Sequence, residues 1–337
     1  MSFPEPGFSK GEVDRSGDRF RAGTATEHDE VVLANWRAAH GRVINVFQAN
    51  LRNRCKEFQY PVGQRLKRFP TIVDKLTRQP EMHLARMNDI AGCRVIFPTI
   101  KSLYQFRDQL LKARWSHKLT HDPDRYDYVE RPKETGYRGI HLVYSFVPRG
   151  RGAEPWRGLR IEIQLRTKAQ HVWATGVETG DLLTKGRAKF GEGADAYRRY
   201  WLLASEIIAR TREGQPSYLA ELSSEEIVYH FEALDQQLNI RRLMRSARRS
   251  QPKLKAEAST VLIYRADRKL PLTAHSFSHW QDAVKFYNKA EKDLADQADV
   301  VLVEADNVKS IRNVFRNYFS NTTDFLRYID AGINLLK

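Results

Sequence analysis

The chain has 337 residues, of which 41% are hydrophobic and 29% charged, and its formal net charge is +15. This hydrophobic content is enough for a buried core and excludes a wholly disordered chain. No apolar run approaches the roughly 20 residues that a membrane-spanning helix needs, so we expect no membrane association. The positive charge favours polyanionic partners such as nucleotides or RNA. A basic protein that binds only small phosphorylated ligands is the ordinary alternative.

Cysteine content and the N-terminus predict a cytoplasmic protein. The two cysteines, Cys55 and Cys93, have no CxxC spacing, which argues against a disulfide framework or a zinc finger and favours a reducing compartment. The first residues lack the charged-then-apolar order of a signal peptide. We expect residues 1–26 to be a mobile tail.

The middle of the chain alternates between helix and strand patterns. A long amphipathic helix is predicted over residues 27–58, because apolar side chains recur there at spacings of three and four. A basic segment, residues 63–81, follows it. Interleaved strands and helices predict an α+β fold with a mixed sheet of about five strands flanked by helices. Further strands are expected at 93–97, 141–146 and 159–167, the last two as a hairpin, and helices at 102–114, 168–186 and 194–212.

A second domain, a small α+β unit, is predicted over residues 223–337. Ser223 and Glu226 have the spacing of a capping box, which indicates a helix start after a boundary near residue 215. Residues 241–255 carry seven basic side chains and no acidic one. They could contact RNA, although a solvated helix end or linker is the ordinary alternative. His275 and His279 lie four apart and could share a helix face, but no metal site is expected there.

The stretch LRIEIQLRT, residues 159–167, alternates without a fault between apolar and polar side chains. Such alternation is typical of a strand with one face on the core. Its polar face carries Arg160, Glu162, Gln164 and Arg166. That face is either a solvated sheet surface or the wall of a site.

Three segments together carry the residue types that pyrophosphoryl transfer requires. Basic groups clamp phosphates, hard oxygen ligands hold a divalent ion, and a carboxylate positions the attacking hydroxyl. Each residue also has an ordinary structural interpretation. Asp89 could cap a turn before Gly92, Tyr137 could pack against the core, and the basic side chains could be solvated. The segments are RMNDIAGCRVIF (86–97), DYVERPKETGYRGIHLVYSF (127–146) and IEIQLRT (161–167).

The order and spacing of these segments resemble the successive motifs of the RelA/SpoT-type alarmone synthetase domain, with a nucleotidyltransferase-like fold. GQRLKRFPTIVDKL resembles the basic ATP-binding segment that precedes those motifs in the family. The resemblance covers roughly residues 27–215. It implies transfer of a pyrophosphate group from ATP to the 3′-hydroxyl of a purine nucleotide, with release of AMP.

The resemblance also implies a role for individual residues. Asp89 and Glu162 would be catalytic and would hold Mg²⁺, the expected cofactor. The polar face of residues 159–167 would then be the catalytic wall. ATP would be bound by Arg65, Lys67, Lys75 and Arg94, and the acceptor by Lys133, Tyr137, Arg138, His141, Gln164 and Arg166.

The acceptor segment departs from the family pattern, so three functions stay open. Gly139-Ile140 replaces the usual Ser-Leu, and no histidine follows Glu178-Thr179. The leading hypothesis is a synthetase that uses GDP or GTP. The alternative is a toxin-like enzyme that modifies tRNA 3′ ends or adenosine nucleotides, and a third is a non-catalytic nucleotide- or RNA-binding regulator, against which the intact carboxylates argue.

Two further expectations concern the whole chain. About 26 residues precede the first predicted helix, which is too few for an upstream hydrolase domain, so no alarmone hydrolase activity is expected. A homo-oligomer is compatible with the sequence. Asp89→Asn and Glu162→Gln should each abolish turnover, and the sequence alone predicts little change in stability for either.

Overall fold

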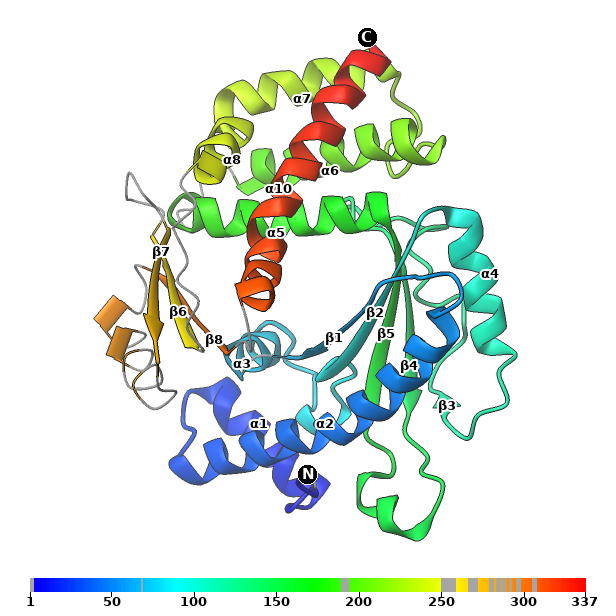
Figure 1. Ribbon diagram of the computed structural model, residues 1–337, viewed down its shortest axis with the longest axis vertical. Coiled ribbons are helices and arrows are strands. Elements are labelled where there is room, and N and C mark those ends of the chain that lie inside the picture. The colour runs from blue at the N-terminus through cyan, green and yellow to red at the C-terminus, as the bar shows by residue number, and fades with distance from the viewer. Residues whose placement is uncertain are drawn as a thin grey trace. The chain divides into compact units, whose positions relative to one another are not determined.

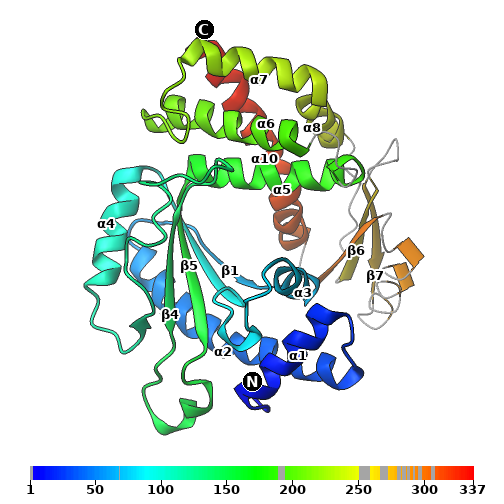
Figure 2. The same ribbon diagram turned by 180° about the vertical axis from the view of Figure 1, so that it is seen from behind.

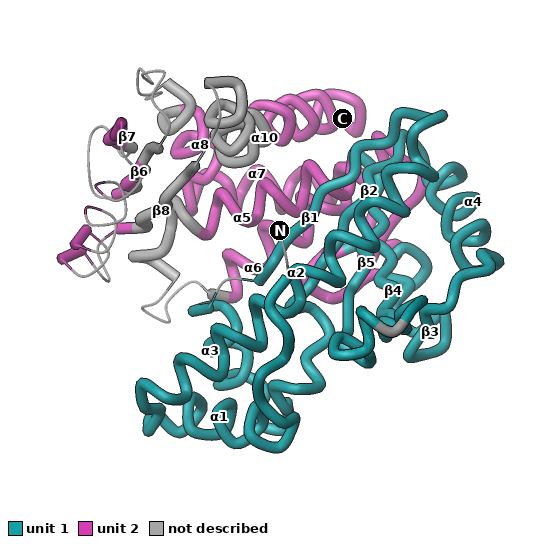
Figure 3. Tube along the Cα trace, turned by 60° about the horizontal axis from the view of Figure 1, so that its bottom comes forward, with its two compact units in different colours: residues 1–131, 138–168 teal, residues 132–137, 169–337 magenta. Residues whose placement is uncertain are grey.

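The computed structural model describes residues 3–67, 69–188, 194–249, 259–265, 272–278, 298–304 and 308–337, and isolated positions between 282 and 294. The chain forms two compact units, residues 1–131 with 138–168 and residues 132–137 with 169–337 (Figure 3). This division falls inside the predicted domain 27–215 rather than between residues 215 and 223. The functional domain boundaries therefore stay a prediction.

The first unit is built on a mixed five-stranded sheet, as the sequence predicts. The strand order is β1-β2-β5-β4-β3. Strands β2 and β5 are parallel and the other neighbours are antiparallel, so β4 and β5 form the expected hairpin. The strands are β1 (Val62–Leu66), β2 (Ala91–Phe97), β3 (Lys118–Leu119), β4 (Ile140–Ser145) and β5 (Arg160–Thr167).

One face of this sheet is covered by helices. On β2, Cys93, Val95 and Phe97 are buried and alternate with less buried residues. The buried side chains join the apolar stripes of α2 (Glu27–Cys55) and α4 (Ile100–Leu111) in one core. Helix α2 lies in front of the strands in Figure 1 and behind them in Figure 2. The alternate residues of β2 and β5 therefore face away from α2.

The N-terminal segment is helical, which corrects the prediction of a mobile tail over residues 1–26. Helix α1 (Lys10–Ala22) packs on α2 and on α3 (Phe69–Arg78). Asp29 of α2 is fully buried and accepts hydrogen bonds from Ser16 at 2.7 Å and from Nε of Arg19 at 2.9 Å. This polar anchor lies 10 to 13 residues from its partners in sequence, so no local periodicity reveals it.

The second unit is a helical assembly with a small separate sheet. Capping of α7 by Ser223 and Glu226 is confirmed by two reciprocal hydrogen bonds, of 3.1 and 2.7 Å. A π-helical turn, Ala209–Glu213, follows α6. The helices, drawn in Figure 1, are α5 (Lys168–Ala188), α6 (Ala194–Ile208), α7 (Ser224–Leu238), α8 (Ile240–Arg249) and α10 (Val308–Leu336).

The C-terminal sheet has three strands. Its order is β7-β6-β8, with β6 (Ser259–Tyr264), β7 (Leu272–Phe277) and β8 (Asp299–Glu304). His275 lies in β7 and not on a helix, while His279 lies outside the described residues. Among the helices that the structure describes, none has the length and apolar character needed to cross a bilayer.

The basic run 241–255 is partly neutralised where it is described. In α8, Arg241 forms ion pairs with Asp235 at 2.8 Å and with Asp330 at 3.0 Å, and Arg245 pairs with Asp330 at 2.8 Å. These arginines join α8 to α7 and α10. Residues 250–255 of the run lie outside the described residues.

Candidate active site

Asp89 precedes β2 and lies between two lysines. Nζ of Lys67 donates to Oδ2 of Asp89 and Nζ of Lys75 donates to Oδ1, each at 2.8 Å. The backbone N–H of Lys67, just after β1, bonds to the carbonyl of Ile90 at 2.8 Å, which fixes this lysine beside Asp89. Lys75 comes from α3. The sequence predicted both lysines as ATP ligands, and the structure brings them to the predicted metal ligand.

The lysines keep Asp89 ionised. Burial alone would raise the pKa of this carboxyl, but the ammonium groups of Lys75 and Lys67 outweigh burial and lower the pKa. All three side chains are at most 20% exposed. Two ammonium groups therefore flank one carboxylate.

Glu162 lies on the central strand β5 and is held by two neighbours. Its Oε2 accepts from Nδ1 of His141 at 3.1 Å, and its Oε1 accepts from Nε2 of Gln164 at 2.6 Å. In the β4–β5 register His141 lies opposite Gln164, which is two residues from Glu162 and on the same face. Arg94 of β2 lies opposite Gln164 and donates to it through Nε at 3.3 Å.

Lys75 links the two carboxylates into one electrostatic site. Burial tends to raise the pKa of Glu162, but His141, Gln164 and the charge of Lys75 together lower it to about 2. Lys75 therefore acts on both Asp89 and Glu162. The register also places Gly92 opposite both Glu162 on β5 and Arg65 on β1, so Arg65 joins this row of the sheet.

The polar row of β5 is thus a hydrogen-bonded surface rather than a solvated one. The side chain of Glu162 is only 14% exposed. Arg166, two residues beyond Gln164, and Arg138, which precedes β4, are both buried. The first unit therefore brings together eight of the predicted residues on one side of its sheet or at its edge, namely Arg65, Lys67, Lys75, Asp89, Arg94, His141, Glu162 and Gln164.

Two predicted acceptor ligands, Lys133 and Tyr137, belong to the second unit. Nζ of Lys133 lies 5.6 Å from the centre of the Tyr137 ring, and that ring meets Trp173 edge-on at 6.3 Å. Gly136 between them has φ +85° and accepts a 2.6 Å hydrogen bond from Ser205 of α6. Within this unit Tyr137 is a half-buried packing residue that keeps contact with a cation.

Tyr126 and Tyr128 are site neighbours that sequence reasoning missed. Tyr128 meets the His141 ring edge-on at 5.5 Å, and Tyr126 lies 6.3 Å from Tyr128. Hydrogen bonds from Tyr128 N to Gly139 O and from His141 N to Tyr126 O pair this segment with β4. Buried Asp127 points the other way and accepts from Tyr104 at 3.1 Å. In the sequence, the alternation Tyr126-Asp127-Tyr128 could have indicated that the two tyrosines lie on the same side of an extended segment.

The comparison with known proteins decides the family of this region. A model described as "Region found in RelA / SpoT proteins" matches residues 64–181. Those residues include Lys67, Asp89 and Glu162. Residues 64–181 are a RelA/SpoT domain. The predicted resemblance to this family is confirmed for that range.

Curated relatives of the RelA/SpoT domain carry names that describe pyrophosphate transfer. GTP pyrophosphokinase YjbM of Bacillus subtilis is 29% identical over 166 residues, which cover 47% of this chain and 75% of the relative. GTP pyrophosphokinase YwaC of the same organism is 32% identical over 117 residues, which cover 33% of this chain and 52% of that relative. These names support the expectation of a pyrophosphotransferase.

Solved structures include small alarmone synthetase 1 from Bacillus subtilis bound to its product pppGpp. It is 24% identical, with 51% of this chain and 89% of that chain covered, and the TM-score is 0.43. The assignment of the RelA/SpoT domain rests on the sequence match and not on this likeness.

Asp89 and Glu162 carry oxygen ligands of the kind that Mg²⁺ prefers. Within the described residues no group of three or more His, Cys, Asp or Glu side chains could hold a metal. Mg²⁺ in nucleotide-using enzymes needs only one or two carboxylates, because water and substrate phosphates complete its shell. The lowered pKa values of Asp89 and Glu162 keep both oxygen ligands ionised at neutral pH.

Proposed function

We propose that this chain is an ATP-dependent pyrophosphokinase that transfers pyrophosphate from ATP to the 3′-hydroxyl of GDP or GTP and releases AMP. The observation that carries the proposal is that Lys75 interacts with both carboxylates of a RelA/SpoT domain. Lys75 donates a hydrogen bond to Asp89, as Lys67 does, and its charge lowers the pKa of Glu162. The names of two relatives as GTP pyrophosphokinases support guanosine acceptors.

The cations of the site bind the phosphates of ATP in this proposal. Lys67 and Lys75 balance the charges of Asp89 and Glu162, and Arg65 adds positive charge along β1. Arg94 reaches the same face from β2 through its contact with Gln164. Charge on the transferred group is spread over its oxygens in the transition state, so fixed cations there lower the barrier.

Glu162 positions the attacking hydroxyl. With a pKa of about 2, it is ionised and a weak base, so its main role is to accept a hydrogen bond from the 3′-hydroxyl. The 3′-oxygen forms a bond to the β-phosphorus of ATP as the bond to the bridging oxygen breaks. AMP leaves with that electron pair, and the hydroxyl proton passes to solvent. His141 and Gln164 keep the Glu162 side chain in place for this step.

Mg²⁺ is the proposed cofactor, held by Asp89 and Glu162. When bound, it neutralises phosphate charge and polarises the transferred group. Asp89 would exchange one lysine contact for the metal, and the released ammonium would then face the phosphates.

Acceptor recognition is proposed for Lys133, Tyr137, Arg138, His141, Gln164 and Arg166. The family resemblance supports these roles. His141 and Gln164 contact Glu162 directly, which places two of the six beside the group proposed to bind the 3′-hydroxyl. A planar tyrosine face with an adjacent ammonium, as at Tyr137 and Lys133, suits a phosphorylated purine nucleotide.

The test is transfer of labelled phosphate. The purified full chain is incubated with Mg²⁺ and ATP labelled on the β-phosphate, with GDP, GTP, ADP, further ATP or bulk tRNA offered separately. Label in a guanosine product together with AMP release is expected. Label only in tRNA or in an adenosine product would replace the proposed acceptor, and absence of transfer to every acceptor would contradict the proposed activity.

A further inference from the structure

The first unit contains a pocket on the face of the sheet that α2 covers. It is an open, shallow pocket with a volume of about 670 Å³. Val62 of β1 lines it, whereas Arg65 faces the opposite side of the strand because three residues separate the two positions. The cavity is therefore separate from the proposed active site. Its lining residues are Ala49, Arg52, Asn53, Cys55, Lys56, Gln59, Tyr60 and Val62.

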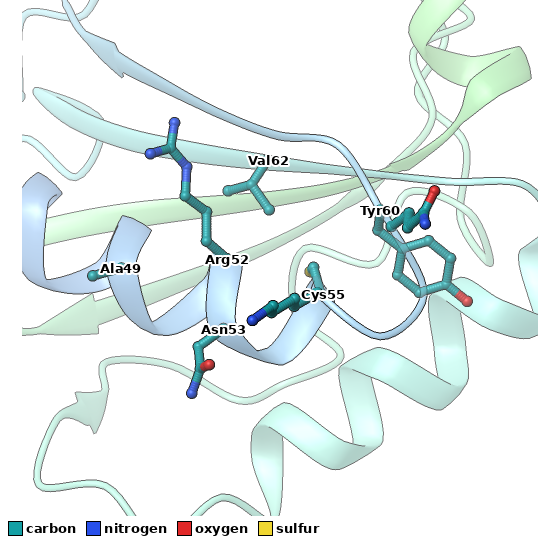
Figure 4. Close-up of a pocket in the computed structure, with 8 residues that line it drawn as sticks. Ala49, Arg52, Asn53, Cys55, Tyr60 and Val62 are labelled. Atoms are coloured by element: carbon teal, nitrogen blue, oxygen red, sulfur yellow. The ribbon is translucent and has the colours of Figure 1, made fainter.

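The charged side chains of this cavity are both cations. Arg52 and Lys56 are exposed, and no carboxylate among the described residues forms an ion pair with either. They lie four residues apart at the end of α2, so both side chains project from one face. Figure 4 shows Arg52 reaching from α2 toward the strand that carries Val62. Two such cations in one recess favour an anion such as phosphate.

Tyr60 also lines the pocket and belongs to an aromatic pair. The rings of Tyr60 and Phe58 stack with centroids 5.3 Å apart and planes 15° apart, and Phe58 is 53% exposed. Tyr60 also meets Phe97 of the core edge-on at 4.9 Å, which fixes its ring. Gln59 between the two aromatics has φ +52°, and this left-handed turn is what puts both rings on one side of the chain.

The remaining lining side chains offer hydrogen bonds to a planar ring. Asn53 and Gln59 each carry an amide donor and an amide acceptor, and both are exposed at the cavity. Two cations, a fixed aromatic ring and amide side chains along one pocket match a nucleotide, which joins a phosphate to a base. We propose that this pocket binds a nucleoside monophosphate, with the phosphate at Arg52 and Lys56 and the base beside Tyr60.

Photo-crosslinking tests this site locally. The full chain carrying Glu162→Gln is irradiated with 8-azido-AMP or 8-azido-GMP, and crosslinked peptides are mapped by mass spectrometry. The expected crosslinks fall on residues 56–60. Equilibrium dialysis with labelled AMP and GMP gives the affinity, and ribose 5-phosphate and guanosine serve as competitors that lack the base or the phosphate.

Paired variants decide the outcome. The double variant Arg52→Ala with Lys56→Ala should remove the crosslink and weaken nucleotide binding at least tenfold. The control Lys112→Ala with Arg114→Ala removes the same charge elsewhere on the unit. It should change neither the crosslink nor the affinity. Tyr60→Leu should weaken nucleotide binding but not competition by ribose 5-phosphate. Thermal midpoints confirm that each variant folds. Crosslinks that avoid residues 56–60, or an Arg52/Lys56 variant with unaltered binding, would overturn the proposal, whether or not the chain transfers pyrophosphate.

Discussion

Asp89 accepts hydrogen bonds from two lysines that come from different parts of the chain. Removing its negative charge is therefore an informative test of its role. Asp89→Asn should abolish pyrophosphate transfer, because the amide is a poor Mg²⁺ ligand. Binding of a non-hydrolysable ATP analogue without Mg²⁺ should persist or tighten, since Lys67 and Lys75 are then released to the phosphates. Calorimetric titration and the β-phosphate transfer assay measure the two effects.

Asp74 on α3 offers the matched control for Asp89. It pairs with Arg78 on the helix surface, where both side chains are more than half exposed, so Asp74→Asn should cost less than about 1 kcal/mol of stability. The rate of pyrophosphate transfer by the Asp74→Asn variant should equal that of the unaltered chain. If Asp89→Asn retained turnover, Asp89 would have no place in the mechanism.

Glu162 should make the stability of the fold depend on pH. Its pKa falls from 4.5 to about 2 on folding, against the tendency of burial to raise it and because of His141, Gln164 and Lys75. A lowered folded pKa stabilises the native state above pH 4.5, and this contribution is lost as the pH falls toward 2. The sequence alone predicted little stability change for Glu162→Gln. The structure predicts a loss of up to about 3 kcal/mol at pH 7.

Urea unfolding at several pH values checks this prediction. The difference in unfolding free energy between the unaltered chain and Glu162→Gln should be largest at pH 7 and shrink between pH 4.5 and 2. A difference that stays constant over that interval would show that Glu162 does not have the lowered pKa. Asp74→Asn again serves as the control, because its ion pair is exposed.

At the scale of single elements, the sequence predicted which side chains share a face of a strand or helix. It did not predict features that depend on contacts between residues distant in the chain. The alternation of residues 159–167 placed Glu162 and Gln164 on one face of β5, and their 2.6 Å hydrogen bond agrees with that placement. The lysine contacts of Asp89 span 14 and 22 residues and could not be read from spacing. Helix α1 was missed for the same reason, because its stability depends on buried Asp29 of the next helix.

The segment that carries Lys133 and Tyr137 depends on a glycine. Gly136 has φ +85°, and a Cβ atom there would lie 2.9 Å from Cβ of Ser205 and 3.1 Å from Cα of Leu202. Gly136→Ala therefore combines backbone strain with a steric clash and should cost about 2–4 kcal/mol. If Tyr137 binds the acceptor, the apparent KM for GDP should also rise more than that for ATP.

Gly150 separates strain from clash in this experiment. Its φ is +101°, but no atom lies within 4 Å of an added Cβ. Gly150→Ala should therefore cost only the backbone strain, about 1–3 kcal/mol, and leave both KM values unchanged. Equal losses of stability for the two substitutions would show that the contact with α6 does not restrain Gly136.

For the whole molecule, the C-terminal third is less separable than the sequence indicated. Side chains of α7 and α10 lie in the same hydrophobic core as those of α5 and α6, including Phe231, Phe325 and Ile333 together with Trp201 and Ile207. Removal of residues 223–337 would expose that core, so truncation cannot by itself distinguish a regulatory domain from a structural one. A point substitution at the α6–α10 contact gives a cleaner measurement.

Gly332 of α10 is the position for that substitution. A Cβ atom there would lie 2.5 Å from Cγ2 of Ile207 and 3.2 Å from Oγ1 of Thr211. Glycine to alanine in a helix normally stabilises by about 1 kcal/mol, so a loss of stability would isolate the clash. We expect Gly332→Ala to lower the unfolding free energy of this unit by about 1–3 kcal/mol in urea. The exposed Asn334→Ala, two residues on, should be neutral or slightly stabilising. If Gly332→Ala behaved like Asn334→Ala, the close approach of α10 to α6 would not contribute to the fold, and residues 308–337 could be treated as an appendage.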